Sequence, residues 1–470
     1  MSIRLRPLTF ALLIAGVSAQ ASATDLIQAY DLARQSDPQF AASEAQKQAQ
    51  EAGIGISRGA LLPQITADVN YNRSFTSSSG NQVFAGTPTP LNSTYSESSN
   101  RNSGVNLRQS LYDHSNYTRL GASKARSRQA DAEYDAAADA LIVRVADAYF
   151  NVLTAIETLS ASRAEERSVK RQLDQAEKRL EVGLAPITDV HEARARYDSA
   201  RANAILQATA LDDAYEALAE ITGQPLSNLK GLSADFRPLN PDTRTIEEWV
   251  TIALESNPTL KAYVEALAAA QKDVGTARAA HYPTLSATAS YGDDARWGDS
   301  TLRTSPTSLS QFGSASTGPS YGVTLTVPVF SGFATRSRVR QALYQRDAAA
   351  DRLEQQKRSI TRTTRGAYRN LIAGLAEVEA RRLAVVSAQA AYEAGEAGLE
   401  VGTRTIVDVL IAQQQLFQAQ REYARARHAY LVNLLRLRQA AGILEASDLE
   451  LVNRFLVADA DASLDRVDRE

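Results

Sequence analysis

The sequence predicts an α+β membrane protein that is built from two tandem copies of one structural unit. Three observations lead to this prediction: an N-terminal export signal, an internal repeat, and a switch between helix and strand periodicity inside each copy. The repeat is the strongest of the three, because Leu180-Glu181-Val182-Gly183 returns unchanged as Leu399-Glu400-Val401-Gly402, 219 residues later. Other matches follow in the same order at offsets of 218 to 220 residues, which indicates a duplication.

Residues 1–23 have the features of a secretory signal peptide. Arg4 and Arg6 precede an apolar stretch that is too short for a membrane-spanning helix, and Ala21-Ser22-Ala23 is a small-x-small cleavage pattern. We expect export to remove this segment and to change the formal net charge from −3 to −5. A chain that is so weakly acidic gives no reason to expect nucleic-acid binding.

Repeat one is predicted over residues 24–223. It begins with a short helix at about 25–35, which ends before Asp37-Pro38 because the residue before proline avoids the helical conformation. After a second helix of about 20 residues, apolar and polar residues alternate with the period of two that is typical of strands. This alternation predicts strands at about 63–75 and 103–112.

A loop and a helical hairpin complete repeat one. Of the 25 residues at 76–100, 18 are Ser, Thr, Asn, Gly or Pro, so we expect a solvated, flexible loop there. A long helix is predicted at 115–182, where 68 residues contain no proline and would span about 100 Å at 1.5 Å per residue. Apolar residues recur along it at spacings of three and four, which favours coiled-coil-like packing against the return helix at 187–222.

Repeat two follows the same order after a linker, and a short acidic segment follows repeat two. The linker is predicted at 224–245, repeat two at 246–442 and an acidic C-terminal tail at 443–470. Within repeat two we expect strands at about 283–292 and 320–330 with a loop at 293–318 between them, then a long helix at 334–401 and a return helix at 405–441.

Four strands in one chain predict an oligomer. Each predicted strand has about the ten residues that cross a bilayer at a tilt, but about eight strands are the practical minimum for a closed barrel. Because open sheet edges are not tolerated in lipid, we expect a dimer with eight strands or a trimer with twelve. The alternative is an exported coiled-coil structural or adhesion protein without a pore.

The sequence gives no sign of an enzyme. The four histidines are scattered, the chain has no His-Glu-x-x-His motif, and it has no cysteine to join the histidines in a zinc site. There is no Gly-Lys-Ser/Thr phosphate loop either. We assign no catalytic, cofactor-binding or metal-binding residues.

Three motifs match those of a known family. They are Val182-Gly183-Leu184 with Ile187-Thr188-Asp189-Val190, then Val401-Gly402-Thr403-Arg404-Thr405-Ile406-Val407-Asp408-Val409-Leu410, and the strand exit Val327-Pro328-Val329-Phe330-Ser331-Gly332. Along nearly its whole mature length the chain resembles the TolC family of outer-membrane efflux and secretion channels. The resemblance implies a homotrimer in which a twelve-stranded β-barrel, with four strands from each chain, continues into a long periplasmic α-helical barrel.

The resemblance also implies a location and partners. Such channels lie in the outer membrane of Gram-negative bacteria, in contact with its lipid, and have a large periplasmic part. They export drugs, amphiphiles or proteins in tripartite efflux or type I secretion systems. Their partners are a periplasmic adaptor (a membrane fusion protein) and an inner-membrane pump of the RND, MFS or ABC type.

Two aspartates occupy equivalent places just after the hairpin tips. If the tips converge on a threefold axis, Asp189 and Asp408 each form a ring of three carboxylates, which attracts cations and raises the pKa of its own members. For Asp408 there is an alternative role, because Thr405-x-x-Asp408 matches a helix capping box. The two roles are compatible.

The resemblance assigns a latch to Arg404. A surface charge without a partner is the alternative, but in the family this arginine bonds to the positions of Thr188 and Asp189 in a neighbouring hairpin and holds the channel shut. Two positions depart from the family pattern: Leu399 replaces the gate tyrosine, and Ile411 replaces a second constriction acid. We therefore expect fewer latches and a less acidic ring.

The hairpin tips have two expected roles. Glycine permits the positive φ that a chain often needs directly after a helix, so the turn geometry explains the paired Val-Gly motifs. By resemblance the tips also receive the hairpin of the adaptor. The predicted docking residues are Val182, Gly183, Leu184, Val401, Gly402 and Thr403.

Overall fold

A computed structural model describes residues 23–84, 87–233, 236–238, 244–302 and 305–460, so the predicted signal peptide at 1–23 lies almost entirely outside the described residues. The chain divides into two compact units. The hairpin unit contains residues 1–43, 135–257 and 358–470. The sheet unit contains residues 44–134 and 258–357.

The two copies contribute the same elements at nearly the same lengths. Repeat one contains α1 (Leu26–Ser36), α2 (Pro38–Gly59), β1 (Gln64–Phe84), β2 (Thr87–Tyr112), α3 (His114–Glu181) and α4 (Ile187–Thr222). Repeat two contains α5 (Ile246–Ser256), α6 (Pro258–Ala279), β4 (Thr284–Leu302), β5 (Ser305–Thr326), α7 (Ala334–Glu400) and α8 (Ile406–Ala441). None of the helices in the described ranges is both long and apolar enough to cross a membrane.

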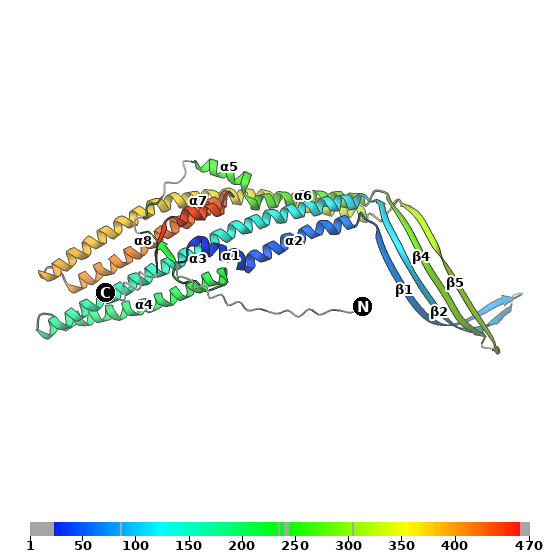
Figure 1. Ribbon diagram of the computed structural model, residues 1–470, viewed down its shortest axis with the longest axis horizontal. Coiled ribbons are helices and arrows are strands. Elements are labelled where there is room, and N and C mark those ends of the chain that lie inside the picture. Colours follow the sequence, from blue (N-terminus) through cyan, green and yellow to red (C-terminus); the bar gives the residue numbers. More distant parts are fainter. Residues whose placement is uncertain (1–22, 85–86, 234–235, 239–243, 303–304, 461–470) are drawn as a thin grey trace, which may run out of the picture. The chain divides into compact units, whose positions relative to one another are not determined.

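The sheet unit contains one antiparallel sheet in the order β1-β2-β4-β5, so that β1 and β5 form its edges (Figure 1). The register aligns apolar residues from strand to strand, as in the row Ile65, Leu107, Ala289 and Tyr321. Side chains on this face stay largely exposed, with Ile65 at 67% and Tyr321 at 88%. The opposite face carries polar residues because side chains alternate along a strand.

The strands are much longer than the sequence predicts, and the predictions of a flexible loop at 76–100 and of a loop at 293–318 are wrong. β1 continues to Phe84 and β2 begins at Thr87, so most of the first of these segments is paired strand. The ladder joins backbone groups, so it does not require the apolar alternation on which the prediction depended. Pro88 and Pro90 fit because β2 pairs with β4 only from Thr94 onward, which leaves this stretch at an edge.

Two further boundaries are corrected. The last strand does not reach 330 but ends at Thr326, two residues before Pro328, which has no N–H to donate to a ladder. The segments predicted as a linker and an acidic tail also contain structure. Within them, β3 (Lys230–Leu232) pairs with β6 (Leu456–Asp459), and α9 (Ala446–Asn453) precedes β6.

The bases of the two hairpins are anchored in the same way. α4 ends at Gly223 with φ +73° and α8 ends at Gly442 with φ +70°. The Ser36 hydroxyl donates to the carbonyl of Thr222 at 2.6 Å, and the Asn257 side chain donates to that of Ala440 at 3.1 Å. Each return helix is thereby fixed to the end of the first short helix of its own copy.

Inside the hairpin unit, α3 and α8 run antiparallel and are joined by three ion pairs, which we call the inner seam. Arg436 bonds Asp147 at 2.9 Å, Arg427 bonds Glu157 with two contacts of 3.1 Å, and Arg421 bonds Glu165 at 2.7 Å. From one pair to the next the residue number rises along α3 and falls along α8. This order is expected of two antiparallel helices that are paired in a single register.

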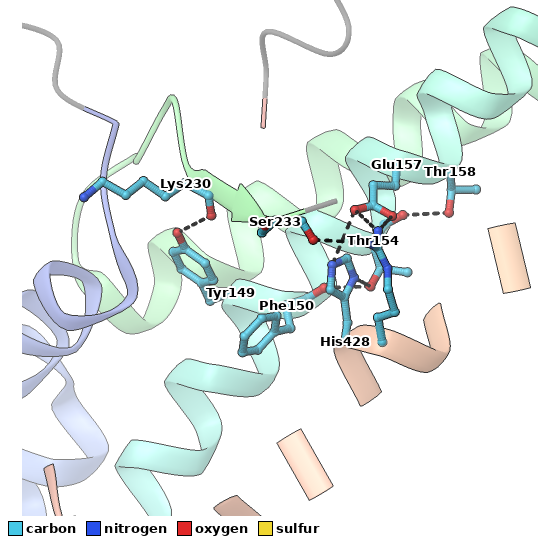
Figure 2. A network of polar contacts seen from close by, with 9 residues as sticks. Tyr149, Phe150, Thr154, Glu157, Thr158, Lys230, Ser233 and His428 are labelled. Atoms are coloured by element: carbon cyan, nitrogen blue, oxygen red, sulfur yellow. Dashed lines mark hydrogen bonds and ion pairs between the residues drawn. The ribbon is translucent and has the colours of Figure 1, made fainter. Parts of the chain in front are cut away.

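A buried histidine lies at the middle of the inner seam (Figure 2). Only 2% of His428 is exposed; its Nδ1 is 2.8 Å from the Thr154 hydroxyl and its Nε2 is 3.6 Å from the Glu157 carboxylate. Burial, and then the positive charge of Arg427, lower the pKa of His428 to about 3. His428 is therefore neutral in the folded chain at neutral pH.

Acid should weaken the fold through His428. An unfolded histidine binds a proton below about pH 6.5, whereas the folded side chain remains neutral down to about 3. Stability is therefore lost as the pH falls through this window, by about 1.4 kcal/mol per pH unit. Urea unfolding between pH 7.5 and 4.5 should show this loss, and His428→Gln should reduce it. His191→Gln, at an exposed histidine, is the control, and equal acid sensitivity in all three proteins would contradict the assignment.

Candidate functional site

The tips of the two hairpins share one turn geometry. Gly183 follows α3 with φ +76° and Gly402 follows α7 with φ +79°. The residue after each glycine donates a backbone hydrogen bond to the last turn of the helix. The Leu184 N–H donates to the Arg179 carbonyl at 2.7 Å, and the Thr403 N–H donates to the Gly398 carbonyl at 2.8 Å. These bonds satisfy helix carbonyls that otherwise lack partners, and the positive φ explains why both positions are glycine.

The side chains at the tips point outward and are apolar. Val182 is 68% exposed, Leu184 71% and Val401 75%, and Thr403 is exposed beside them. Exposed apolar groups that lie close together on a surface are typical of contact sites for another protein. The predicted docking role of these residues remains a prediction.

Behind the tips, an apolar cluster holds three helices together. It consists of buried residues of α3, α4 and α8, namely Val169, Leu173, Ala176, Val190, Ala193, Ile406 and Leu410. Leu399 of α7 packs against this cluster and is partly buried. At this position, where the resemblance led us to expect a tyrosine, Leu399 contributes apolar packing and has no side-chain group that forms hydrogen bonds.

Asp408 takes part in a capping box. Its carboxylate accepts from the Thr405 N–H at 3.0 Å and from the Thr405 hydroxyl at 2.8 Å, while its own N–H donates back to that hydroxyl at 3.2 Å. These hydrogen bonds, the backbone one first, hold the pKa of Asp408 below its ordinary value, and the charge of Arg404 adds to the effect. The structure therefore confirms the capping role of Asp408 at the start of α8.

Asp189 is in a different environment although it occupies the aligned position. The residue that precedes α4 is Pro186, which provides no side-chain cap. Asp189 is half-buried, Thr188 is exposed, and the Asp189 N–H donates to the carbonyl of Pro186 at 3.2 Å. Both copies thus have an aspartate at this position, but the groups that bond to its side chain and backbone differ.

Arg404 is exposed beside the α7–α8 turn, and its side chain lies against Gly398. A Cβ atom at that glycine would come within 2.6 Å of Arg404 Cγ. Within the described part of the chain, the Arg404 guanidinium has no hydrogen-bond or ion-pair partner. The structure of one chain therefore does not bring Arg404 to Thr188 or Asp189, and their contact stays a prediction for neighbouring chains.

A polar layer above the apolar cluster was missed by the sequence analysis. Gln413 of α8 is fully buried and donates to the Ser168 hydroxyl of α3. Gln172 of α3 donates to Glu396 of α7 at 3.5 Å, and the Tyr392 hydroxyl donates to the same carboxylate. Burial, and then this carboxylate, raise the pKa of Tyr392 to about 12. The layer connects α3 to both helices of the second hairpin.

The sequence contains a signal that could have identified this layer. Gln172 lies three residues after Val169 and four before Ala176, on the apolar stripe of α3. A polar residue on a buried stripe requires a partner. No group of three or more His, Asp or Glu side chains in the described ranges is placed to hold a metal ion.

Whole-chain comparisons identify relatives of this architecture. The chain is 36% identical to the outer membrane protein TolC of Vibrio cholerae, over 96% of this chain and 98% of that one. It is 30% identical to the alkaline protease secretion protein AprF of Pseudomonas aeruginosa, over 92% and 87% of the two chains. The fold matches the crystal structure of the Campylobacter jejuni CmeC outer membrane channel with a TM-score of 0.71, at 19% identity, covering 92% of this chain and 89% of that one.

The fold and these relatives place the chain among channel-forming outer-membrane proteins, which are not enzymes. The family described as outer membrane efflux protein matches residues 29–224 and 249–443, with one match in each copy. The chain belongs to this family. It is an outer-membrane channel of a Gram-negative bacterium and acts in efflux or type I secretion. The predicted α+β fold, with four strands of one sheet in each chain, is confirmed.

The difference between the two aligned aspartates, Asp408 in a capping box and Asp189 without one, can be measured. Asp408→Ala should speed hydrogen exchange of the amides in the first turn of α8, because it removes the acceptor for the Thr405 N–H. Asp189→Ala, the matched control, should leave the first turn of α4 unchanged. Because the pKa of Asp408 is lowered, the wild-type cap should persist to a pH below 3.8 and be lost as the pH falls further. Equal effects at the two tips would contradict this assignment.

Proposed function

We propose that the chain forms a homotrimer in which three sheets close into a twelve-stranded barrel and six hairpins form a periplasmic tunnel. Drugs, amphiphiles or proteins would pass through this tunnel across the periplasm and the outer membrane. The observation that carries the proposal is the four-stranded sheet with edges at β1 and β5. Backbone groups that are exposed to hydrocarbon cost several kcal/mol each, so β5 of one chain needs β1 of the next.

The two faces of the sheet support the same arrangement. In the barrel, the exposed row that contains Ile65 and Tyr321 faces lipid. The alternate positions face the lumen, where Asn106 donates to Asp68 at 2.6 Å. A polar interior with an apolar exterior is the pattern expected of a water-filled membrane barrel.

The hairpin tips form the closed entrance of the tunnel in this proposal. Arg404 bonds to Thr188 and Asp189 of the neighbouring protomer and holds the tips together. Within the described part of its own chain the Arg404 guanidinium makes no hydrogen bond or ion pair and acts on Asp408 through its charge alone, so its N–H groups are available to a neighbour. The contact between Gln172 and Glu396 adds a tie inside each protomer.

The two aspartates line the narrow end in this proposal. Three copies of Asp408 and three of Asp189 form carboxylate rings that attract cations. The ring at Asp408 lacks a second acid because position 411 is isoleucine, which is exposed. The capping bonds favour the charged form of Asp408, so this ring remains negative at neutral pH.

The partners follow from the same proposal. The exposed tip residues receive a periplasmic adaptor, and the adaptor connects the tunnel to an inner-membrane pump of the RND, MFS or ABC type. The family, with TolC of Vibrio cholerae and AprF of Pseudomonas aeruginosa among the relatives, supports both efflux and type I secretion. The exported substrate is identified with a strain that lacks this protein. Increased drug sensitivity would indicate drug efflux, and loss of secreted proteins would indicate type I secretion.

The channel itself is tested with the purified protein. We expect trimers in detergent that dissociate on heating and that conduct ions across a planar lipid bilayer. A water-soluble monomer without conductance would overturn the proposal and would favour a structural or adhesive role.

The latch is tested at Arg404. Arg404→Ser should raise the single-channel conductance, because it removes the bonds that hold neighbouring tips together. Arg201→Ser, at an exposed arginine of α4 outside the tips, is the control. A closed state with wild-type conductance in the Arg404 variant would remove the latch role.

The carboxylate ring is tested with multivalent cations. Asp408→Ala should weaken the block of the channel by hexaamminecobalt, because the ring loses three charges. Ile411→Asp should strengthen the block, since it adds three. Unchanged block in the Asp408 variant would leave this residue only its capping role.

A further inference from the structure

Six arginines lie where the strands of the sheet unit meet its helices (Figure 1). The four junctions are residues 55–65, 109–121, 275–287 and 326–343. They contain no lysine and one acid, Asp113, whose carboxylate already accepts from the N–H and the hydroxyl of Ser115. We call the arginines of these junctions the collar, namely Arg58, Arg119, Arg278, Arg336, Arg338 and Arg340.

The repeat places arginine at both kinds of junction in both copies. Arg58, near the end of α2, aligns with Arg278, near the end of α6, at an offset of 220 residues. Arg119, near the start of α3, aligns with Arg338, near the start of α7, at an offset of 219. The two copies differ in charge along their hairpins, so a charge that both retain at this end of the sheet indicates a requirement that both share.

The collar has no partner of its own. Within the described part of the chain, none of the six guanidiniums forms a hydrogen bond or an ion pair, and all six residues are exposed. Arginines farther along α3 are paired, Arg126 with Asp273 at 2.6 Å and Arg128 with Glu265 at 2.7 Å. The N–H groups of the collar are therefore available to an anion from outside the chain.

The helix dipole explains only part of the collar. Arg58 and Arg278 lie in the last turns of α2 and α6, where a positive charge is favourable. Arg119, Arg336 and Arg338 lie in the first two turns of α3 and α7, where a positive charge is unfavourable. Neither of these helices has an acid in its first turn, whereas α4, α5 and α8 each have one. A bound anion would offset this cost.

Exposed apolar side chains lie next to the collar, on its strand side. The alternation of exposed apolar residues on β5 continues past the end of the strand to Val327 and Val329, and Val329 is 94% exposed. Phe330 and Phe333 follow, both exposed, with their ring centroids 5.5 Å apart. An apolar and aromatic border beside a row of basic residues is the pattern of a protein surface at the boundary between acyl chains and headgroups.

The collar is close enough to this border to reach headgroups. Arg340 is the farthest of the six from its junction, and it lies six residues after Ala334, or about 9 Å along α7. The headgroup layer of a bilayer extends about 5 to 8 Å beyond the hydrocarbon. Arginine side chains extend along apolar surface and place their charge at such a boundary, so they close the remaining gap.

We propose that the collar binds the phosphates of an anionic phospholipid, phosphatidylglycerol, in the periplasmic leaflet of the outer membrane. The proposal rests on the sheet crossing that membrane, as proposed above. The planar guanidinium matches phosphate oxygens with parallel N–H donors. A zwitterionic headgroup adds an ammonium that the arginines repel. A soluble phosphate has no acyl chain to cover Phe330 and Phe333, which is why we assign a lipid.

The collar is tested with the double variant Arg119→Gln and Arg338→Gln. Detergent-solubilised trimer is titrated with phosphatidylglycerol or with phosphatidylcholine, and bound lipid is counted by native mass spectrometry. The wild type should retain phosphatidylglycerol in preference to phosphatidylcholine and lose it as ammonium acetate is raised. The variant should bind phosphatidylglycerol at least about fivefold more weakly. It should still fold, because glutamine suits a helix and the change removes charges from positive helix ends.

The matched control is Arg362→Gln with Arg369→Gln, two exposed arginines farther along α7, which should bind lipid as the wild type does. Equal binding of phosphatidylglycerol by the wild type and the Arg119/Arg338 variant would overturn the proposal, as would equal binding of the two lipids by the wild type. Displacement of the lipid by inorganic phosphate at a similar concentration would assign the collar to a soluble anion instead.

The same samples separate the collar from the channel. A trimer that conducts ions in a planar bilayer but shows no preference for phosphatidylglycerol would overturn the collar and leave the channel intact. Protein that neither forms a trimer nor conducts would overturn the channel, and the collar with it.

Discussion

The unpaired edges of the four-stranded sheet are the constraint on which the rest of the molecule depends. β1 and β5 each pair on one side only, and one face of the sheet is apolar and exposed. In hydrocarbon a backbone N–H or C=O has no water to bond, so a single chain cannot satisfy its own strands. Only further copies can pair these edges. In the proposed homotrimer the hairpins of three copies are also related by a threefold axis, and the proposed latch and carboxylate rings depend on that symmetry.

Duplication provided a second set of elements, and divergence gave the two sets different chemistry. The turns at Gly183 and Gly402 have the same geometry, but Thr405 caps α8 where Pro186 precedes α4 without a side-chain cap. The same contrast recurs along the helices, where charged residues of the inner seam align with glycine and alanine on α4 and α7. Backbone geometry is thus conserved between the copies, while several side-chain bonds found at a position in one copy are missing at the aligned position of the other.

The sequence predicted the helices better than the strands, and for a physical reason. The long helix expected at 115–182 is found at His114–Glu181, because the absence of proline within it and the glycine just after it act locally. The strand expected at 63–75 continues to Phe84, since hydrogen bonds between strands extend beyond the apolar segment. The contact of Gln172 with Glu396 was missed because it joins residues 224 positions apart. The partner of Arg404 could not be found within one chain, since in the proposed trimer it belongs to another protomer.

Leu399 changes the balance of forces at the tips. A tyrosine there would add a directional bond between hairpins, but leucine instead extends an apolar cluster shared by α3, α4 and α8. Apolar packing resists separation but not small shifts, because its free energy depends on buried area and not on angle. Closure that combines such packing with a charged latch at Arg404 would release in two stages. In the proposed trimer the latch would break first, at a defined geometry, and the packed helices would then move with little further resistance while their apolar faces stay covered.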